Sequence, residues 1–202
     1  MFWDNAAFVY DIFADVINRK TNKKLCSVVE KLILPTDNVL ECACGTGLLS
    51  GVIAKKCESL TATDFSEKML ARARQKFAYL GNVKFEKADI LRLSYPNETF
   101  DVIVAANVIH LLDDPHKALS ELFRVCKPGG RLIIPTYMNK TAKGASNGVS
   151  DVIDRVGANF RQRFTPGSYE KFFADAGYKN AEYTLCDGVI PCVSALLRKE
   201  NF

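Results

Sequence analysis

The chain has 202 residues and a formal net charge of +4, and 48% of its residues are hydrophobic against 25% charged. This balance is typical of a globular protein and excludes a fibrous or intrinsically disordered chain. The mild positive charge does not call for a nucleic-acid partner, and no run approaches the roughly 20 apolar residues of a membrane span. We therefore expect one soluble domain, since domains usually have about 100–200 residues.

The start of the sequence and its cysteines predict a cytoplasmic location. Met1-Phe2-Trp3-Asp4 lacks the basic region and the apolar core of a secretory signal. The seven cysteines are odd in number and irregularly spaced, which indicates reduced thiols rather than a disulfide framework. Cys42 and Cys44 are two apart, but no His or Cys pair completes a ligand pattern, so we expect no metal site.

Two helices are expected near the N-terminus. Apolar residues at helical spacing predict the first over residues 4–18. The second is expected after Thr21, a candidate N-cap, and before Pro35. The basic cluster Arg19–Lys24 fits either a solvated face or a site for an anionic group, and the sequence leaves both open.

Strands and helices alternate through the middle of the chain. Apolar strands without clean alternation suit a parallel sheet covered on both faces, so we predict an α/β doubly wound fold. The strands are expected at Val39–Ala43, Leu60–Asp64, Val83–Ala88, Phe100–Ala106 and Arg131–Thr136. The helices between them are expected at Leu48–Lys56, Glu67–Phe77 and His116–Cys126. A turn is expected at Lys127–Gly130.

The C-terminal part has a different pattern. Residues 137–149 are rich in small and polar residues and predict a loop, and a helix is expected near residues 150–160. Thr165-Pro166 predicts the start of another helix, which Gly177 is expected to end. Two strands, at about 178–186 and 189–198, flank Asp187-Gly188 and predict a closing hairpin.

The strongest chemical signal is a glycine-rich turn that runs from a strand into a helix. It reads Glu41-Cys42-Ala43-Cys44-Gly45-Thr46-Gly47. Glycines let a ligand approach the backbone, and a helix N-terminus offers free N–H groups. Asp64 ends the next strand about 20 residues later, the usual place for a carboxylate that binds ribose hydroxyls. The pattern predicts a nucleotide-like cofactor at the carboxyl ends of the strands.

Two classes of cofactor fit this turn. A nicotinamide dinucleotide prefers a third glycine where this chain has Ser50, and its pyrophosphate would be repelled by an ionised Glu41. A cofactor with an amino group suits that acid better. The dinucleotide stays an alternative at this point.

The chain resembles the class I S-adenosylmethionine-dependent methyltransferases over about residues 37–136. The matching segments are Val39–Gly47, Thr63–Leu70, Ala88–Ile90, Phe100–Leu112 and Arg124–Leu132. It is most similar to the small-molecule branch that includes ubiquinone and menaquinone biosynthesis enzymes (methyltransferase type 11). The resemblance implies a Rossmann-like, mostly parallel seven-stranded sheet with the last strand antiparallel. It divides the chain into an N-terminal helical lid, residues 1–36, and a cofactor-binding domain, residues 37–202.

The resemblance also assigns roles to residues, with S-adenosylmethionine as cofactor and S-adenosylhomocysteine as product. The methionine part is expected against Glu41 and the backbone of Ala43, Cys44, Gly45, Thr46 and Gly47, with Asn107 and Val108 nearby. The ribose is expected on Asp64, and the adenine on Phe65, Met69, Asp89 and Ile90. Ala43 departs from the glycine that the family often has there. Met69 also fits a plain core position, and Asp89 also fits a turn cap.

Two further residues are candidates near the methyl group. His110 follows the fourth strand, and a neutral histidine can accept a proton from a nucleophile, although a structural role fits as well. Tyr10 is a candidate for an aromatic lid over the sulfonium, or for ordinary core packing.

The predicted function is methyl transfer to a small-molecule acceptor by in-line displacement. A dinucleotide-dependent oxidoreductase and a non-catalytic cofactor-binding module are the alternatives. A nucleic-acid partner is not expected, because Asn107-Val108-Ile109-His110 lacks the Asn/Asp-Pro-Pro-aromatic motif and the chain has no added recognition domain. We expect a monomer or homodimer, and the acceptor atom stays open.

Overall fold

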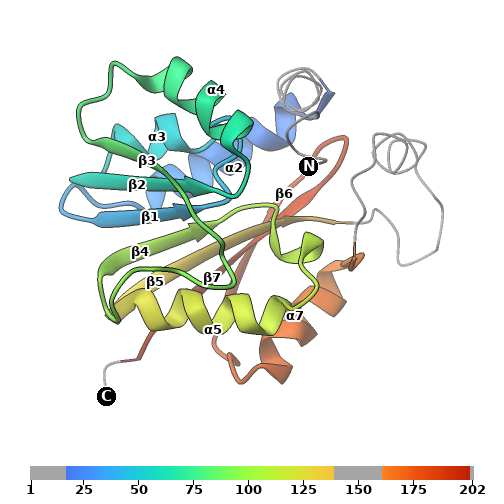
Figure 1. Cartoon of the computed structure of the whole chain (residues 1–202). Coiled ribbons are helices and arrows are strands. Elements are labelled where there is room, and N and C mark those ends of the chain that lie inside the picture. Colours follow the sequence, from blue (N-terminus) through green and yellow to red (C-terminus); the bar gives the residue numbers. More distant parts are fainter. Residues whose placement is uncertain (1–16, 139–160, 201–202) are drawn as a thin grey trace.

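The computed structural model describes residues 17–138 and 161–200. Its strands are β1 (Asn38–Cys42), β2 (Ser59–Asp64), β3 (Val83–Lys87), β4 (Phe100–Ala105), β5 (Cys126–Tyr137), β6 (Glu182–Cys186) and β7 (Cys192–Arg198). They form one seven-stranded sheet in the order β3-β2-β1-β4-β5-β7-β6 (Figure 1). Strands β1 to β5 pair in parallel, whereas β7 pairs antiparallel with both β5 and β6. The predicted fold class is confirmed.

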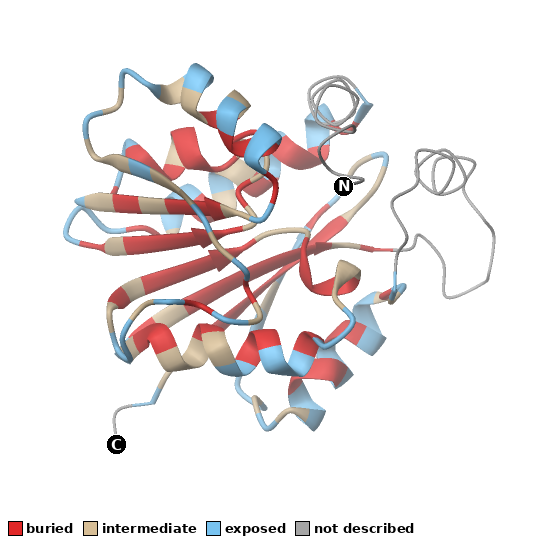
Figure 2. Ribbon diagram, viewed as in Figure 1, coloured by how far each residue is buried: buried red, intermediate tan, exposed pale blue. Residues whose placement is uncertain are grey.

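Helices cover both faces of this sheet (Figure 1). They are α2 (Arg19–Lys31), α3 (Ser50–Ala54), α4 (Glu67–Phe77), the 3-10 helix η2 (Ile109–Leu111), α5 (Pro115–Val125) and α7 (Pro166–Asp175). One core joins the sheet to α2, α3 and α4, and the other joins it to α5 and α7. The central strands are buried along most of their length (Figure 2).

Successive side chains of β4 serve opposite cores. Val102 and Val104 lie in the core shared with α2 and α3, and Ile103 and Ala105 lie in the core shared with α5 and α7. This period of two is inherent in a strand, and both sets are apolar because both faces are covered. The near-continuous apolar run of β4 thus has a direct structural reason.

Several predicted helix ends are confirmed. Ser66 caps α4 by accepting a hydrogen bond from Met69 N–H at 3.3 Å, and Asp114 accepts one from Lys117 N–H at 2.9 Å at the start of α5. Thr165 and Ser168 form a reciprocal capping box at the start of α7. Gly177 follows α7 with φ of +94°, a left-handed conformation that favours glycine.

Two local predictions are wrong. Thr21 is not an N-cap, because α2 already begins at Arg19 and Thr21 lies buried inside it. Residues Lys127–Gly130 do not form a separate turn, because β5 begins at Cys126, which pairs with Phe100 of β4. The pairing is irregular between Phe100 and Val102, so the strand continues through a Pro-Gly-Gly sequence that locally predicts a break.

The N-terminal end of α2 is fixed to the turn between β6 and β7. Asn18 Oδ1 accepts hydrogen bonds from Ile190 N–H at 3.0 Å and from the Thr21 hydroxyl at 2.9 Å. The Thr21 hydroxyl also lies 3.0 Å from the Ile190 carbonyl oxygen. Lys24 forms an ion pair with Asp187, so part of the basic cluster contacts the protein itself. We refer to these contacts as the α2–hairpin contact.

Some expectations lie outside the described residues. They are most of the helix predicted over residues 4–18, the loop after residue 138 and the helix near residues 150–160. Within the described ranges, no helix is long and apolar enough to cross a membrane.

Candidate functional site

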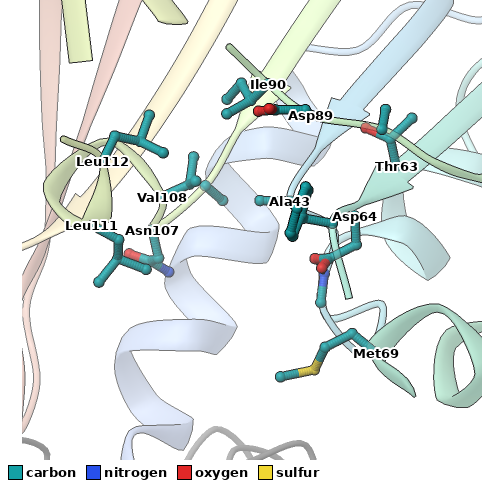
Figure 3. Close-up of a pocket in the computed structure, with 14 residues that line it drawn as sticks. Ala43, Thr63, Asp64, Met69, Asp89, Ile90, Asn107, Val108, Leu111 and Leu112 are labelled. Atoms are coloured by element: carbon teal, nitrogen blue, oxygen red, sulfur yellow. The ribbon is translucent and has the colours of Figure 1, made fainter. Parts of the chain in front are cut away.

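A cavity of about 310 Å³ opens at the carboxyl ends of β1, β2 and β4. This is the edge at which open parallel sheets bind ligands. Asp64 and Met69 lie on one side of it, and Leu111 and Leu112 lie on the other (Figure 3). The full lining is Ala43, Gly45, Thr63, Asp64, Phe65, Met69, Ala88, Asp89, Ile90, Ala106, Asn107, Val108, Leu111 and Leu112.

Asp64 holds the glycine-rich turn in place. Its Oδ2 accepts a hydrogen bond from Gly45 N–H at 2.8 Å, and its Oδ1 accepts one from Ser66 N–H at 2.8 Å. A carboxylate has about four acceptor positions, so these two bonds leave capacity for a ligand's hydroxyl groups. Asp64 therefore links the turn after β1 to the start of α4 and also lines the cavity.

The backbone of the turn is left-handed at three positions. Ala43, Gly45 and Gly47 have φ of 54°, 56° and 90°. Glycine adopts such values without cost, whereas alanine there costs roughly 1–2 kcal/mol. Gly47 has a second constraint, because a Cβ there would lie 2.5 Å from a ring carbon of Phe77 in α4. Gly47 thus permits helix packing, while Gly45 faces the cavity.

The side of the cavity next to β2 and β3 combines acidic and flat apolar groups. Phe65 is 48% exposed, and Lys87 Nζ lies 5.6 Å from the centroid of its ring. Asp89 Oδ1 accepts a hydrogen bond from Leu91 N–H at 2.9 Å. Met69 and Ile90 are buried and complete this wall. Such a wall suits the ribose and base of a nucleoside.

The side formed after β4 is mostly apolar. Val108, Leu111 and Leu112 line it, together with one polar side chain, Asn107. Asn107 has φ of +53°, and its N–H donates a hydrogen bond to the Pro135 carbonyl at 2.8 Å. In Figure 3 the amide oxygen of Asn107 lies on the side of Leu111.

Glu41 lies beneath the turn, outside the set of lining residues. It is 2% exposed, and its Oε2 accepts a hydrogen bond from the Ser50 hydroxyl at 2.6 Å. Burial raises the pKa of the Glu41 carboxyl to about 8, with a further increase from the charge of Asp64. Folding therefore favours the protonated form of this carboxyl, which weakens the repulsion of a pyrophosphate expected from the sequence.

His110 is buried in η2, with 3% of its surface exposed, and it is not among the lining residues. Burial lowers the pKa of its imidazole to about 3, so it stays neutral at physiological pH. Its role as a general base remains a prediction. Tyr10 lies outside the described residues.

The structure brings together most of the predicted contacts but not all of them. The cavity is lined by Ala43, Gly45, Asp64, Phe65, Met69, Asp89, Ile90, Asn107 and Val108, but not by Cys44, Thr46 or Gly47. Thr63, Ala88, Ala106, Leu111 and Leu112 line it without having been named as site residues. The first three directly precede named residues, so strand ends would have indicated them. Leu111 and Leu112 depend on the path of η2, which has no clear signal in the sequence.

Comparison with known proteins gives this arrangement a context. Residues 40–134 match the family described as "Methyltransferase domain". The chain is 38% identical over 102 residues to a phosphatidylethanolamine N-methyltransferase of Cereibacter sphaeroides. The aligned residues make up 49% of this chain and 50% of that protein. It is 26% identical to a ubiquinone/menaquinone biosynthesis C-methyltransferase UbiE of Hydrogenovibrio crunogenus, over 93% of this chain and 85% of that protein.

A solved structure shares the fold over almost the whole chain. An S-adenosylmethionine-dependent methyltransferase of Thermotoga maritima superposes with a TM-score of 0.76 at 20% identity, covering 98% of this chain and 99% of that one. The chain spans about half the length of the first curated relatives that it matches.

Proposed function

We propose that the protein transfers a methyl group from S-adenosylmethionine to a small-molecule acceptor, because residues 40–134 match the family described as "Methyltransferase domain". The observation that carries this proposal is Asp64. Its carboxylate ends β2, lines the cavity and is already oriented by Gly45 and Ser66. A carboxylate held in this way suits two neighbouring hydroxyl groups of a ribose.

The described residues fit this cofactor in chemistry and order. Asp64 would hold the ribose, Phe65 and Met69 would contact the base, and Asp89 would accept from its amino group. The backbone at Gly45 would accommodate the methionine part, because no side chain stands in its way. When bound, S-adenosylmethionine supplies an electrophilic methyl group on a sulfonium.

The protein's own contribution would be alignment and exclusion of water. Alignment of two reactants contributes about 7–11 kcal/mol in favourable cases, so such a site does not need a catalytic triad. Val108, Leu111 and Leu112 provide an apolar wall at the end of the cavity where the acceptor would enter. His110 supports the loop that carries this wall, because its carbonyl accepts a hydrogen bond from Gln162 N–H at 3.1 Å.

The acceptor, partners and location are also part of the proposal. The relatives named above act on nitrogen in one case and on carbon in the other, so their names do not fix the acceptor atom. A reducing, cytoplasmic location agrees with seven cysteines that are all free. A monomer or homodimer, the absence of a nucleic-acid partner and a lid of residues 1–36 stay predictions.

Isothermal titration calorimetry with S-adenosylhomocysteine tests the cofactor directly. We expect saturable binding with one site per chain, and no binding of NAD⁺ or NADP⁺. A screen with methyl-labelled cofactor against phenols, quinols, amines, thiols and lipid headgroups then tests transfer. Nicotinamide-cofactor binding without S-adenosylhomocysteine binding would contradict the proposal, and cofactor binding without any transfer would favour a non-catalytic module.

A further inference from the structure

Helix α2 presents a strongly basic face to solvent. Its buried side packs on the sheet through Thr21, Asn22, Leu25 and Val29. The exposed residues lie on the opposite side of the helix, and all but two of them are basic: Arg19, Lys20, Lys23, Lys24, Ser27, Glu30 and Lys31. We call the five Lys and Arg side chains the basic face of α2.

Acidic groups of the chain neutralise only part of the basic face. Asp187 forms ion pairs with Lys20 and Lys24. The acid of α2 itself, Glu30, lies 3.6 Å from Lys56 instead. The three other cations of this face form no ion pair with any residue that the structure describes: Arg19, Lys23 and Lys31. Like charges three or four positions apart on a helix repel each other, so an external anion would stabilise this face.

Exposed aliphatic side chains lie at both ends of the basic face. Ile17 precedes α2 and is 41% exposed, and Leu34 follows it and is 49% exposed. Val189 is 42% exposed and lies beside the start of α2, because the next residue, Ile190, donates a hydrogen bond to Asn18. These three, which we call the aliphatic flanks, are half of the large apolar side chains that are exposed within the described ranges.

The types of side chain favour one class of polyanion. A nucleic acid offers phosphates to Lys and Arg, and its unpaired bases stack on aromatic rings. No exposed residue of α2 is aromatic, and the exposed aromatic side chains Phe65 and Tyr79 lie elsewhere. Aliphatic side chains instead gain free energy by leaving water at an apolar interface. A bilayer with anionic headgroups suits both the basic face and the aliphatic flanks.

We propose that α2 binds the surface of an anionic phospholipid bilayer, with the basic face on the headgroup phosphates and the aliphatic flanks in the interface. Strand β7 begins at Cys192, which pairs with Tyr137 at the end of β5, and β5 runs parallel to β4. The turn before β7, and with it the start of α2, therefore lies at the edge of the sheet where the cavity opens. A bilayer bound along α2 would reach the edge at which a ligand enters.

Co-sedimentation of the full chain with vesicles tests this proposal. Vesicles of phosphatidylcholine mixed with phosphatidylglycerol should bind the protein at least about tenfold more tightly than vesicles of phosphatidylcholine alone, because each Lys or Arg at an anionic surface contributes about fivefold. Raising the salt from about 0.1 M to about 1 M should weaken this binding at least about tenfold, since the Debye length falls from about 10 Å to about 3 Å. Equal binding to both vesicles, or binding to neither, would overturn the proposal.

A charge variant locates the binding surface. The combined variant Arg19→Gln, Lys23→Gln and Lys31→Gln removes the unpaired cations and should lower the vesicle partition coefficient about a hundredfold. Its Tm should not fall, because these side chains are exposed and form no ion pair among the described residues. An unchanged partition coefficient would show that α2 is not the binding surface.

A matched control removes the same charge from the other face of the sheet. It combines substitutions at three exposed lysines on and near α5 and α7: Lys117→Gln, Lys171→Gln and Lys179→Gln. Its partition coefficient should change less than about threefold, because a cation far from the bilayer is screened by salt. An equal loss in this control would mean that net charge alone attracts the protein, and the assignment to α2 would be wrong.

The aliphatic flanks distinguish a bilayer from other polyanions. Leu34→Ser combined with Val189→Ser should lower the partition coefficient at least about fivefold, because both side chains then lose apolar contact with the interface. Tyr79→Ser, an equally exposed site away from α2, should not. No effect of the Leu34 and Val189 changes would overturn insertion into a bilayer, and tighter binding of duplex DNA at the same salt would overturn the choice of a membrane. None of these measurements involves S-adenosylmethionine, so their outcome is independent of the proposed function.

Discussion

The two sides of the cavity are built in opposite ways. On the side of β2, the Asp64 carboxylate already accepts two backbone hydrogen bonds and thereby fixes both the turn and the start of α4. On the side of β4, the polar atom that faces apolar neighbours, Asn107 Oδ1, has no donor among the described residues. One side is organised by hydrogen bonds within the chain, whereas the other has a buried acceptor without a described donor.

The largest expected effect tests the organised side. Asp64→Ala removes the acceptor for Gly45 and Ser66 together with the proposed ribose contact. Hydrogen bonds to charged groups contribute about 1.5–3 kcal/mol each, so the Kd of S-adenosylhomocysteine should rise at least about a hundredfold. Calorimetry measures this directly, and Asp64→Asn, which keeps one carbonyl acceptor, should lose less. An unchanged Kd in Asp64→Ala would mean that the Asp64 carboxylate does not organise the cofactor side of the cavity.

Gly47→Ala separates packing from cofactor binding on the same side. Its Cβ would clash with Phe77 and would stand at a positive φ, so we expect the free energy of unfolding to fall by about 1–3 kcal/mol in urea titrations. Phe77→Leu should recover part of this loss when it is combined with Gly47→Ala. If the double variant is no more stable than Gly47→Ala alone, Phe77 is not the reason for the glycine.

A pH titration tests the neutral acid beneath the turn. The pKa of Glu41 is raised from 4.5 to about 8, so folding favours its protonated form. The associated stabilisation is complete below the ordinary value and is lost as the pH rises through about 8. Glu41→Gln carries no charge at any pH, so its Tm should fall less than that of the unaltered protein over this range. Parallel Tm curves for the two proteins would show that Glu41 is ionised when folded.

The smallest effect concerns the alanine in the turn. Ala43 has φ of 54°, so Ala43→Gly should relieve strain and raise the free energy of unfolding by about 0.5–1 kcal/mol. Cofactor affinity should stay within threefold, because the backbone already has the conformation that glycine prefers. A loss of stability in urea titrations would indicate that the methyl group contributes packing that outweighs the strain.

The sequence predicted the elements better than their contacts. Alternation of strands and helices, with start signals such as Thr165-Pro166, located the fold because these signals are local. Local propensity misplaced Thr21 and the segment at Lys127–Gly130. Thr21 contacts Ile190 in the distant turn between β6 and β7, and the segment is continuous with a strand that pairs with β4. The strand ends revealed Asp64 and Asp89, since parallel strands bring their carboxyl ends to one edge. No local sequence pattern indicated that Glu41 accepts a hydrogen bond from Ser50 or that His110 is buried, because both features depend on tertiary packing.

The α2–hairpin contact has a consequence for how the chain reaches its final state. The hydrogen bond from Ile190 to Asn18 joins residues 172 positions apart in the sequence. During synthesis α2 is made before the hairpin, so its polar anchor cannot be completed until Ile190 has left the ribosome. Contacts of such long range close slowly, because the entropy of the intervening chain must be lost first. The docking of α2 on the hairpin should therefore be among the last events of folding, and a chain that stops before β7 should lack it altogether.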